Sequence, residues 1–448
     1  MPFTRVLVAN RGEIAVRIVR ACAALGIESV VAVSDADRTS LAAQLATASV
    51  CIGPAAAKDS YLKPATLVTA ALGTGCQAVH PGYGFLSERA AFSRMCMDAG
   101  LTFIGPSPGA IESMGDKITA VRIASEAGVP RVPGSDRIDN LEDAHREAER
   151  IGYPVLLKAS AGGGGRGMRL VHRREEMAAS IRSASSEAEA AFGDSTLYME
   201  KLVGRARHIE IQILGDSHGN VVHLGERDCS TQRRHQKLIE ESPSPAIDAD
   251  IRARLARYAV DLARRVRYTG AGTVEFVYDE ESRDAYFLEM NTRIQVEHPV
   301  TEMVTGRDLV AEQIRIAQGY PISFSQDEMA MTGHAIECRI NAEDVSRGFA
   351  PSPGRIQDWL EPKDPRVRID THCYAGYLVP PYYDSLLAKM IVHGDSRADA
   401  INRMQSALQG FEIGGISTTL PFHRSVIEHP DFRAGRVTTR WVEEKFLA

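Results

Sequence analysis

The sequence predicts an α/β protein of about three domains, and three features of the chain indicate this class. The first residues alternate strand-like and helix-like patterns. A run of glycines joins two short strand-like segments, and a later pair of strand-like segments carries carboxylates inside apolar runs. The chain has 448 residues, which is the length of about three domains at roughly 150 residues each.

Composition and charge are those of an ordinary globular protein, with 44% hydrophobic and 25% charged residues. The formal net charge of -6 does not suggest a nucleic-acid partner. We find no signal-peptide pattern and no apolar run of about 18 residues, so no membrane association is expected. The 7 cysteines are scattered without a CxxC pair. This argues against a disulfide framework and a zinc site, and a cytoplasmic location is expected.

The N-terminal segment reads as the β-α-β start of a parallel sheet, because apolar runs at 6–9 and 29–33 flank a mostly apolar helix. A dinucleotide site needs three glycines in the first turn, whereas this turn has Gly12 alone, followed by the acidic Glu13. A nicotinamide-dependent dehydrogenase is therefore disfavoured, and no P-loop pattern occurs. The turn HPGYGFLSE at 80–88 fits equally well a tight turn or a ligand loop at the sheet edge.

The glycine run joins strand to strand rather than strand to helix. Residues 155–158 and 168–171 are strand-like, and Gly162 to Gly165 lie between them. A hairpin with a glycine-rich tip covers the ATP phosphates in protein kinases, because glycine lets backbone N–H groups approach phosphate oxygens. Lys158 can reach a phosphate as a point charge. We favour a phosphate-covering flap over the alternative, a flexible linker.

Residues 271–297 predict a β-hairpin with carboxylates inside its strands. Glu275 and Glu289 each interrupt an apolar run, and Asn291 would share a face with Glu289 if the strand continues. A carboxylate in an apolar strand is costly unless it is paired or metal-bound. Carboxylate and amide oxygens suit Mg²⁺. We favour a metal site over the alternative, a buried ion pair, for instance with Arg293.

Two further polar runs predict a site for anions. Arg293, Gln295 and Glu297 alternate, so a cation, an amide and a carboxylate on one face would hold a small anion and deprotonate it. The basic run ERDCSTQRRHQK at 226–237 is a solvated surface or a set of donors for a transferring phosphoryl group. If it is extended, its basic side chains share one face: Arg233, His235 and Lys237.

Taken together, these motifs resemble biotin carboxylase, of the ATP-grasp superfamily, over essentially the whole chain. The matching segments, in order, are ANRGEIAVRI, HPGYGFLSE, MGDK, KASAGGGGRGM, RHIEIQ, ERDCSTQRRHQK, EMNTRIQVEHPVTEM and AGYLVPPYYDSLLAK. The resemblance implies an α/β fold with a Rossmann-like N-terminal domain at 1–114 and a central ATP-grasp domain at 115–330. The central domain would carry a mobile glycine-rich lid at about 133–203, and a mixed C-terminal domain would follow at 331–448.

The resemblance also implies a role for each matching residue. Binding of ATP is expected at Lys117, Lys158, Gly162, Gly163, Gly164, Gly165, Glu200, Lys201, Leu202, His208, Gln232 and His235. Mg²⁺ or Mn²⁺ is expected on Glu275, Glu289 and Asn291. The bicarbonate site is expected to comprise Lys237, Arg293, Gln295, Val296 and Glu297. Glu297 would be the base that deprotonates bicarbonate, and Arg339 would stabilise the enolate of biotin. Expected catalytic residues are thus Arg339, Glu297, Lys237 and Arg293.

The implied activity is the ATP-dependent carboxylation of biotin by bicarbonate through carboxyphosphate, with ADP and phosphate as products. Biotin is expected to arrive on a separate biotin carboxyl carrier protein. The best match to a Met-Lys-Met biotinylation turn is Ala388-Lys389-Met390, which lies in a strand-like segment. Carboxyltransferase subunits would pass the carboxyl group on, most commonly to acetyl-CoA for fatty acid biosynthesis. Propionyl-CoA, another acyl-CoA, pyruvate or urea are alternatives.

The chain departs from the family at two places, and two rival functions stay open. Ala161 stands where the family often has a fifth glycine, which bears on lid closure. Ala23 and Ala24 replace a charged pair in a helix that contributes to dimers, so a homodimer stays undecided. Another ATP-grasp ligase, of the carbamoyl-phosphate or purine pathway, would lack the combined HPGYGFLSE and TRIQVEHPVTEM motifs. A regulatory subunit that binds ATP without turnover need not keep Glu297 and Arg339.

Overall fold

The computed structural model describes residues 3–159 and 168–447 of the chain. Three larger sheets organise these residues: a five-stranded, a four-stranded and an eight-stranded sheet. The first is parallel and the other two are antiparallel, and helices cover them, which confirms the predicted α/β class. The glycines Gly162 to Gly165, and Ala161 before them, lie outside the described residues. No described helix is both long and apolar enough to cross a bilayer.

The N-terminal sheet confirms the predicted β-α-β opening. Its strands, in spatial order, are β3 (Ala48–Cys51), β2 (Glu28–Val33), β1 (Arg5–Val8), β4 (Ala78–His80) and β5 (Thr102–Phe103). The helices that connect them include α1 (Gly12–Ala24), α3 (Pro64–Gly73) and α4 (Ala90–Asp98). Parallel neighbours need such crossovers, and the strands are apolar because helices cover both faces. The loop at 80–88 leaves the carboxyl end of β4, which pairs with the central strand β1.

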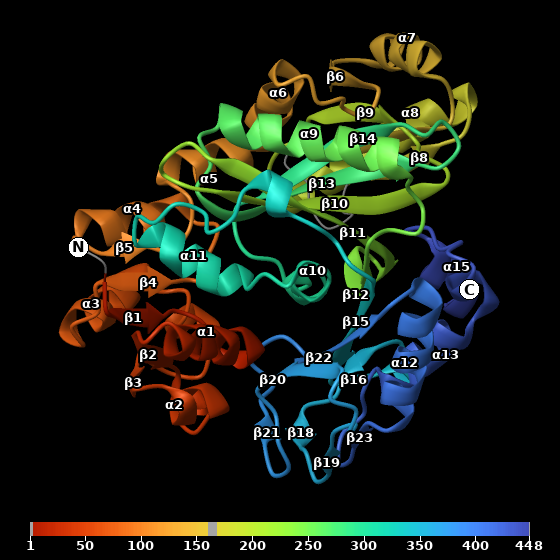
Figure 1. Cartoon of the computed structure of the whole chain (residues 1–448). Coiled ribbons are helices and arrows are strands. Elements are labelled where there is room, and N and C mark those ends of the chain that lie inside the picture. Colours follow the sequence, from red (N-terminus) through yellow and green to blue (C-terminus); the bar gives the residue numbers. More distant parts are fainter. Residues whose placement is uncertain (1–2, 160–167, 448) are drawn as a thin grey trace.

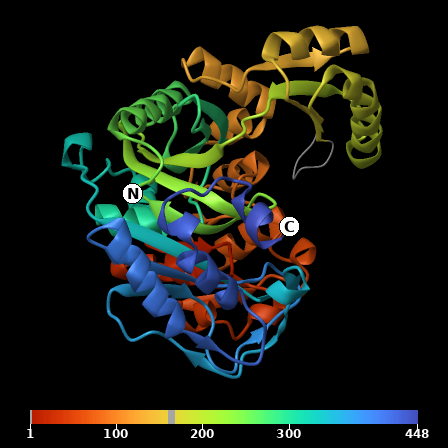
Figure 2. The ribbon, with the colours of Figure 1, turned by 90° about the vertical axis from the view of Figure 1, so that its right-hand side faces the viewer.

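The four-stranded sheet forms an arm that projects from the rest of the molecule (Figure 2). Its strands are β6 (Gly134–Ile138), β9 (Leu197–Lys201), β7 (Val155–Ala159) and β8 (Arg169–Val171). Two helices pack on it, α7 (Leu141–Ile151) and α8 (Met177–Phe192). Asn140 caps α7, because its side chain accepts a bond from the Asp143 backbone N–H. β7 and β8 pair antiparallel on either side of the glycine run, as predicted.

The eight-stranded sheet runs through the middle of the molecule and continues into its C-terminal part (Figure 1). Its strands are β14 (Ala285–Asn291), β13 (Gly270–Asp279), β10 (Ala206–Gly215), β11 (Val221–Arg233), β12 (Gln236–Ser242), β15 (His334–Asn341), β22 (Leu386–Gly394) and β20 (Val367–Thr371). The expected boundary at 330 therefore lies between two adjacent strands of one sheet, since β12 pairs with β15.

Side-chain alternation gives the C-terminal half of this sheet two different faces. Residues such as Ile239, Cys338 and Met390 pack on α12 (Arg397–Gln409) and α13 (Leu420–Glu428) as one apolar core. The opposite face carries charged side chains in adjoining register positions: Glu240, Glu337, Arg339 and Lys389. All but Arg339 are buried, and a buried charge needs a partner. This face leads into the candidate site.

Candidate active site

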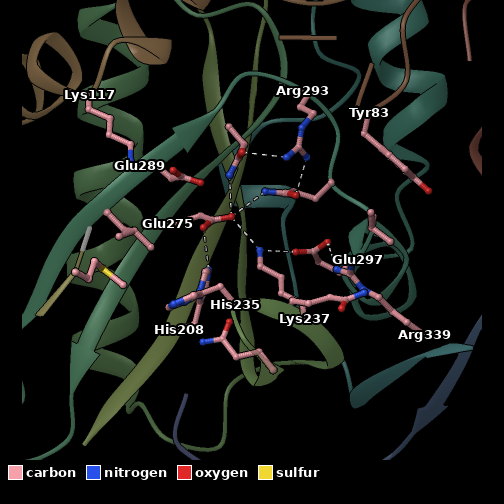
Figure 3. A pocket seen from close by; sticks show the side chains of 18 of the residues that line it. Tyr83, Lys117, His208, His235, Lys237, Glu275, Glu289, Arg293, Glu297 and Arg339 are labelled. Atoms are coloured by element: carbon pink, nitrogen blue, oxygen red, sulfur yellow. Dashed lines mark hydrogen bonds and ion pairs between the residues drawn. The ribbon is translucent and has the colours of Figure 1, made fainter. Parts of the chain in front are cut away.

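A pocket of about 620 Å³ lies between the eight-stranded sheet and the arm (Figure 3). Most of the residues that the sequence singled out line it: Lys117, Lys158, His208, Gln232, His235, Lys237, Glu275, Glu289, Asn291, Arg293, Gln295, Val296, Glu297 and Arg339. Glu200, Lys201 and Leu202, at the end of β9, do not line it. Glu200 instead forms an ion pair with Lys158.

Lys237 is the centre of the charge cluster. Its ammonium lies 2.6 Å from Glu210, 2.9 Å from Glu275 and 2.6 Å from Glu297. In Figure 3 the Lys237 side chain lies between Glu275 and Glu297. Strand pairing creates the cluster, because Glu210 of β10 is the register partner of Glu275 on β13. Each residue lies in a mostly apolar strand, so the carboxylates are buried where Lys237 reaches them.

Neighbouring cations decide the protonation of these carboxylates. Burial alone would raise the pKa of Glu275, but Lys237 and His208 hold it well below the usual range. Burial would likewise raise the pKa of Glu210, which Lys237 and Arg227 lower. Arg227 is itself buried and donates to Glu210 at 2.5 Å. Burial would lower the pKa of His208, but the Glu275 carboxylate raises it to about 9. Both carboxylates are thus ionised and available to a cation.

The hairpin of β13 and β14 brings together the donors that the sequence assigned to a metal. Glu275 and Glu289 are directly opposite in register, and a bulge follows between them and Phe276. Like charges in that arrangement repel. Although the Glu289 side chain is exposed, desolvation at the pocket wall and the Glu275 charge raise its pKa. Asn291 donates to Glu275 at 2.7 Å. Two facing carboxylates and an amide fit a divalent cation with oxygen ligands.

The alternative of a buried ion pair is confirmed for Glu275, but its partners are Lys237 and His208 rather than Arg293, the example that the sequence suggested. Glu275 contacts Lys237 at 2.9 Å and His208 at 3.0 Å. Arg293 instead pairs with Glu88 at 2.8 Å, and Glu88 belongs to the HPGYGFLSE turn. Tyr83 and Gly84 of that turn also line the pocket. The turn therefore reaches the site, which decides the question that its sequence left open.

The segment after β14 does not continue as a strand, contrary to the expectation from its alternation. Residues 292–297 are irregular, and α10 (His298–Thr305) starts directly afterwards. The predicted residues still converge, because Arg293 donates to Gln295 at 2.7 Å and Gln295 donates to Glu275 at 3.0 Å. Lys389 also holds this segment in place, because its ammonium donates to the Val296 carbonyl at 2.9 Å.

Glu297 lies between two cations. It contacts Lys237 at 2.6 Å through one oxygen and Arg339 at 2.9 Å through the other. Burial alone would raise the pKa of Glu297, but Lys237 and Arg339 hold it below the usual value. Arg339 also donates to Glu240 at 2.6 Å. An ionised carboxylate held in this way is available to accept a proton from a bound substrate.

The basic run at 226–237 is extended only as far as Arg233 and then turns, so the expectation that its cations share a face is wrong. β11 ends at Arg233 and β12 begins at Gln236, with Arg234 and His235 in the turn at φ 48 and 66. Arg233 points away from the pocket and stacks on Phe349 at 4.3 Å. Lys237 and His235 line the pocket.

Sequence reasoning missed three acidic residues of the site: Glu88, Glu210 and Glu240. Glu210 and Glu240 had the same signal as Glu275, a carboxylate within an apolar strand. Glu88 had no such signal, because it follows an irregular turn and meets Arg293 from a distant part of the chain.

Comparisons with known proteins agree with this arrangement. Family models match the biotin carboxylase N-terminal domain at 2–111, the ATP binding domain of the carbamoyl-phosphate synthase L chain at 116–325, and the biotin carboxylase C-terminal domain at 337–444. A biotin carboxylase of Nostoc sp. is 55% identical over 445 residues, which cover 99% of both chains. The chain belongs to the biotin carboxylase family.

Solved structures share the whole fold. A Campylobacter jejuni biotin carboxylase in a beta-gamma-ATP complex matches with a TM-score of 0.93 and 47% identity, covering 99% of both chains. The biotin carboxylase domain of the Hydrogenobacter thermophilus 2-oxoglutarate carboxylase, a dimer with MgADP and bicarbonate, matches with a TM-score of 0.91 and 48% identity. That match covers 99% of this chain and 98% of the other.

Family membership makes the chain an ATP-dependent ligase with the ATP-grasp fold, as the resemblance implied. Its reaction class is the ATP-dependent carboxylation of biotin. The rival interpretations as a dehydrogenase, a carbamoyl-phosphate or purine-pathway ligase, or a subunit without turnover are therefore set aside. The match to a carbamoyl-phosphate synthase model at 116–325 reflects the ATP-grasp unit that these ligases share.

Proposed function

We propose that this biotin carboxylase transfers a carboxyl group from bicarbonate to biotin on a separate carrier protein, as the first half-reaction of acetyl-CoA carboxylase. One observation carries the proposal. Glu297 lies 2.6 Å from Lys237 and 2.9 Å from Arg339, inside a pocket that also contains the facing carboxylates Glu275 and Glu289. A base between two cations, next to a site for a divalent cation, is what phosphorylation of bicarbonate requires.

ATP would bind between the arm and the eight-stranded sheet. Lys117 and Lys158 line the same pocket from different elements and would contact the phosphates, with His208, Gln232 and His235 along the nucleotide. The glycine run and the end of β9 at Glu200, Lys201 and Leu202 would complete this site when the arm closes. Glu275, Glu289 and Asn291 would hold Mg²⁺ or Mn²⁺, which neutralises charge on the phosphates.

Bicarbonate would bind beside the metal. Lys237, Arg293 and Gln295 would hold its oxygens, together with the backbone of Val296, and Glu297 would take its proton. The deprotonated anion then attacks the γ-phosphate of ATP and forms carboxyphosphate and ADP. Lys237 already contacts three carboxylates, and proton uptake by Glu297 frees part of the Lys237 charge for the anion.

Arg339 would stabilise the negative charge that develops on the ureido oxygen of biotin. Its guanidinium is held by Glu240 and Glu297 at the pocket wall. The alternative that the chain carries its own biotin on Lys389 is not supported, because Lys389 is fully buried and bonded to Val296. A biotin carboxyl carrier protein would bring the substrate, and carboxyltransferase subunits would use the product.

Several finer assignments belong to this proposal. The domains would be 1–114, 115–330 with the lid at about 133–203, and 331–448, in a cytoplasmic protein. A homodimer is supported by the dimeric state of the Hydrogenobacter thermophilus domain, although Ala23 and Ala24 leave an exposed uncharged end on α1. Acetyl-CoA is preferred as the final acceptor, and the 2-oxoglutarate carboxylase relative is a reason to test others.

The proposal is tested by following labelled bicarbonate. The purified chain, Mg-ATP and labelled bicarbonate are incubated with a biotinylated carrier protein of the same organism, and label on the carrier is measured. ATP-dependent labelling of the carrier supports the proposal, and its absence with a competent carrier contradicts it. Addition of the organism's carboxyltransferase with acetyl-CoA, propionyl-CoA or pyruvate in turn then identifies the acceptor that removes the label.

A further inference from the structure

Two buried carboxyl groups behind Arg339 lack the partners that buried charges need. One oxygen of Glu240 accepts from Arg339 at 2.6 Å, whereas its other oxygen has no hydrogen-bond partner among the described residues. Neither oxygen of Glu337 has such a partner in the described part of the chain. Both side chains are 0% exposed. An ionised carboxylate in that position would be very unfavourable, so at least one proton must reside there.

The sheet places the two carboxyl groups against each other. Glu240 of β12 and Glu337 of β15 are register partners in an antiparallel pair, and their side chains lie on the same face. Such partners have Cβ atoms about 4.5–5.5 Å apart, within reach of a shared proton. A protonated Glu337 can therefore donate its O–H to the free oxygen of Glu240. This single bond gives the free oxygen of Glu240 a partner and leaves Glu337 with only one uncharged carbonyl oxygen unpaired among the described residues.

The charged neighbours do not offer Glu337 another partner. Lys389 of β22 gives its hydrogen bond to the Val296 carbonyl at 2.9 Å and contacts Glu13 at 3.2 Å. Burial raises the pKa of Glu337 well above its usual value, and burial raises that of Glu240 to about 7. The titratable and charged groups around the pair are Arg339 and Cys338 on β15, Lys237 on β12, Cys229 on β11, Glu297 before α10, and His298 of α10 next to Lys389.

We propose that Glu337 is a positioning residue that holds a proton, donates it in a hydrogen bond to Glu240, and so keeps a single negative charge behind Arg339. The part of this inference that concerns catalysis rests on the proposed function of Arg339. Because the Glu240–Glu337 pair then carries only one negative charge, Glu240 orients the Arg339 guanidinium without cancelling its positive charge for a ligand. When Glu297 takes up a proton during the reaction, Arg339 then retains its attraction for the ureido oxygen of biotin.

The protonation itself is tested by thermal unfolding, independently of any activity. The unfolded chain releases the Glu337 proton above about pH 4.3, and the native chain keeps it. The wild type therefore loses stability relative to E337Q, which cannot titrate, as pH rises. The unfolding midpoint of E337Q minus that of the wild type should rise by about 2 °C or more between about pH 5 and about pH 8. A difference that stays constant or falls would overturn the proposal.

The adjacent Glu241 is the matched control, since its side chain points to the other face. Burial would raise the pKa of Glu241, but Arg397 and His334 lower it to about 2. Its stabilising contribution is therefore complete above the unfolded pKa. E241Q should be less stable than the wild type from about pH 5 to about pH 8, without the rising trend of E337Q.

The positioning role is tested by the rate of biotin carboxylation. E337Q keeps a donor for Glu240 and should retain kcat/KM for biotin within about twofold of the wild type at neutral pH, whereas E337L removes the donor and should lose about tenfold. The alkaline fall in kcat/KM of the wild type should move to higher pH in E337Q. Equal loss in both variants would mean that Glu337 acts as an anion and would overturn the proposal. If the wild type itself shows no activity, the proposed function fails while the unfolding experiment still decides the protonation.

Discussion

The five-stranded and the eight-stranded sheet both bury a cation beside carboxylates, but the first pair is enclosed by protein and the second group lies beside an open pocket. At the carboxyl edge of the N-terminal parallel sheet, Arg11 pairs with Asp37 at 2.8 Å, and the ring of Tyr383 covers its guanidinium at 4.0 Å. Tyr377 and Tyr61 fill the remaining space, each with a hydroxyl group in contact with the pair. Around Arg11, this edge, where open α/β sheets usually bind ligands, is sealed by the C-terminal part of the chain, whereas the turn after β4 reaches the pocket with Tyr83 and Gly84.

The eight-stranded sheet instead gathers several charges of both signs around Lys237, beside an open pocket of about 620 Å³. The three carboxylates that contact Lys237 are shared with Arg227, His208 and Arg339, so the charges form a connected network rather than an isolated pair. A buried ion pair therefore indicates a functional site only when it belongs to such a network and open space adjoins it. The sealed pair at Arg11 meets neither condition.

The largest effect is expected from Lys237→Met, because three buried carboxylates lose their common cation. Turnover should fall by at least about 10³-fold, and the free energy of unfolding by about 3–5 kcal/mol, the cost of leaving a buried charge unpaired. ADP release with Mg-ATP, bicarbonate and biotin measures the first quantity, and denaturant unfolding measures the second. Retention of turnover within tenfold would show that the cluster is not the reaction centre.

Glu297→Gln removes the proposed base while keeping the shape of the side chain. We expect turnover to fall by about 10²-fold, with ATP binding unchanged, because Glu297 contacts Lys237 and Arg339 rather than the nucleotide side of the pocket. Isothermal titration with a non-hydrolysable ATP analogue and steady-state ADP release separate the two quantities. Equal losses of binding and turnover would argue that Glu297 only supports the fold of the site.

Glu289→Gln tests whether the facing carboxylates Glu275 and Glu289 bind the metal ion. The Mg²⁺ concentration that gives half-maximal turnover should rise about tenfold, since one of the oxygen ligands loses its charge. In the absence of metal, the variant should be more stable than the wild type by about 0.2–1 kcal/mol, because a like-charge pair across the strands is removed. Lower stability without metal would mean that Glu289 is held by a partner rather than by a bound cation.

Arg11→Met tests the enclosed ion pair of the N-terminal sheet and should have the smallest effect on catalysis. Removing the cation leaves Asp37 buried, so the free energy of unfolding should fall by about 3–5 kcal/mol. Turnover per folded molecule should stay within about twofold, because Arg11 does not line the pocket. A large loss of turnover with little loss of stability would assign a function to the N-terminal sheet.

Local patterns in the sequence predicted much of the fold. The β-α-β opening and the hairpin around the glycine run each depend on residues that are neighbours in the sequence. Burial logic also identified Glu275, because a carboxylate inside an apolar strand needs a partner or a metal.

The partners themselves could not be predicted. The two-residue period of a strand fixes which side chains share a face but not which strand lies beside it. Contacts such as Lys237 with Glu210, or Arg339 with Glu240, therefore needed the register of the sheet. The same applies to Arg293, whose pattern predicted a strand although it lies in an irregular segment held by Glu88.

The most direct test of the account is the release of ADP from the purified protein with Mg-ATP, with bicarbonate and free biotin each present or absent. We predict that biotin accelerates ADP release, that this acceleration vanishes without bicarbonate, and that Glu297→Gln abolishes it. ADP release that is indifferent to both bicarbonate and biotin would contradict the assignment of the pocket around Lys237 as a site of biotin carboxylation.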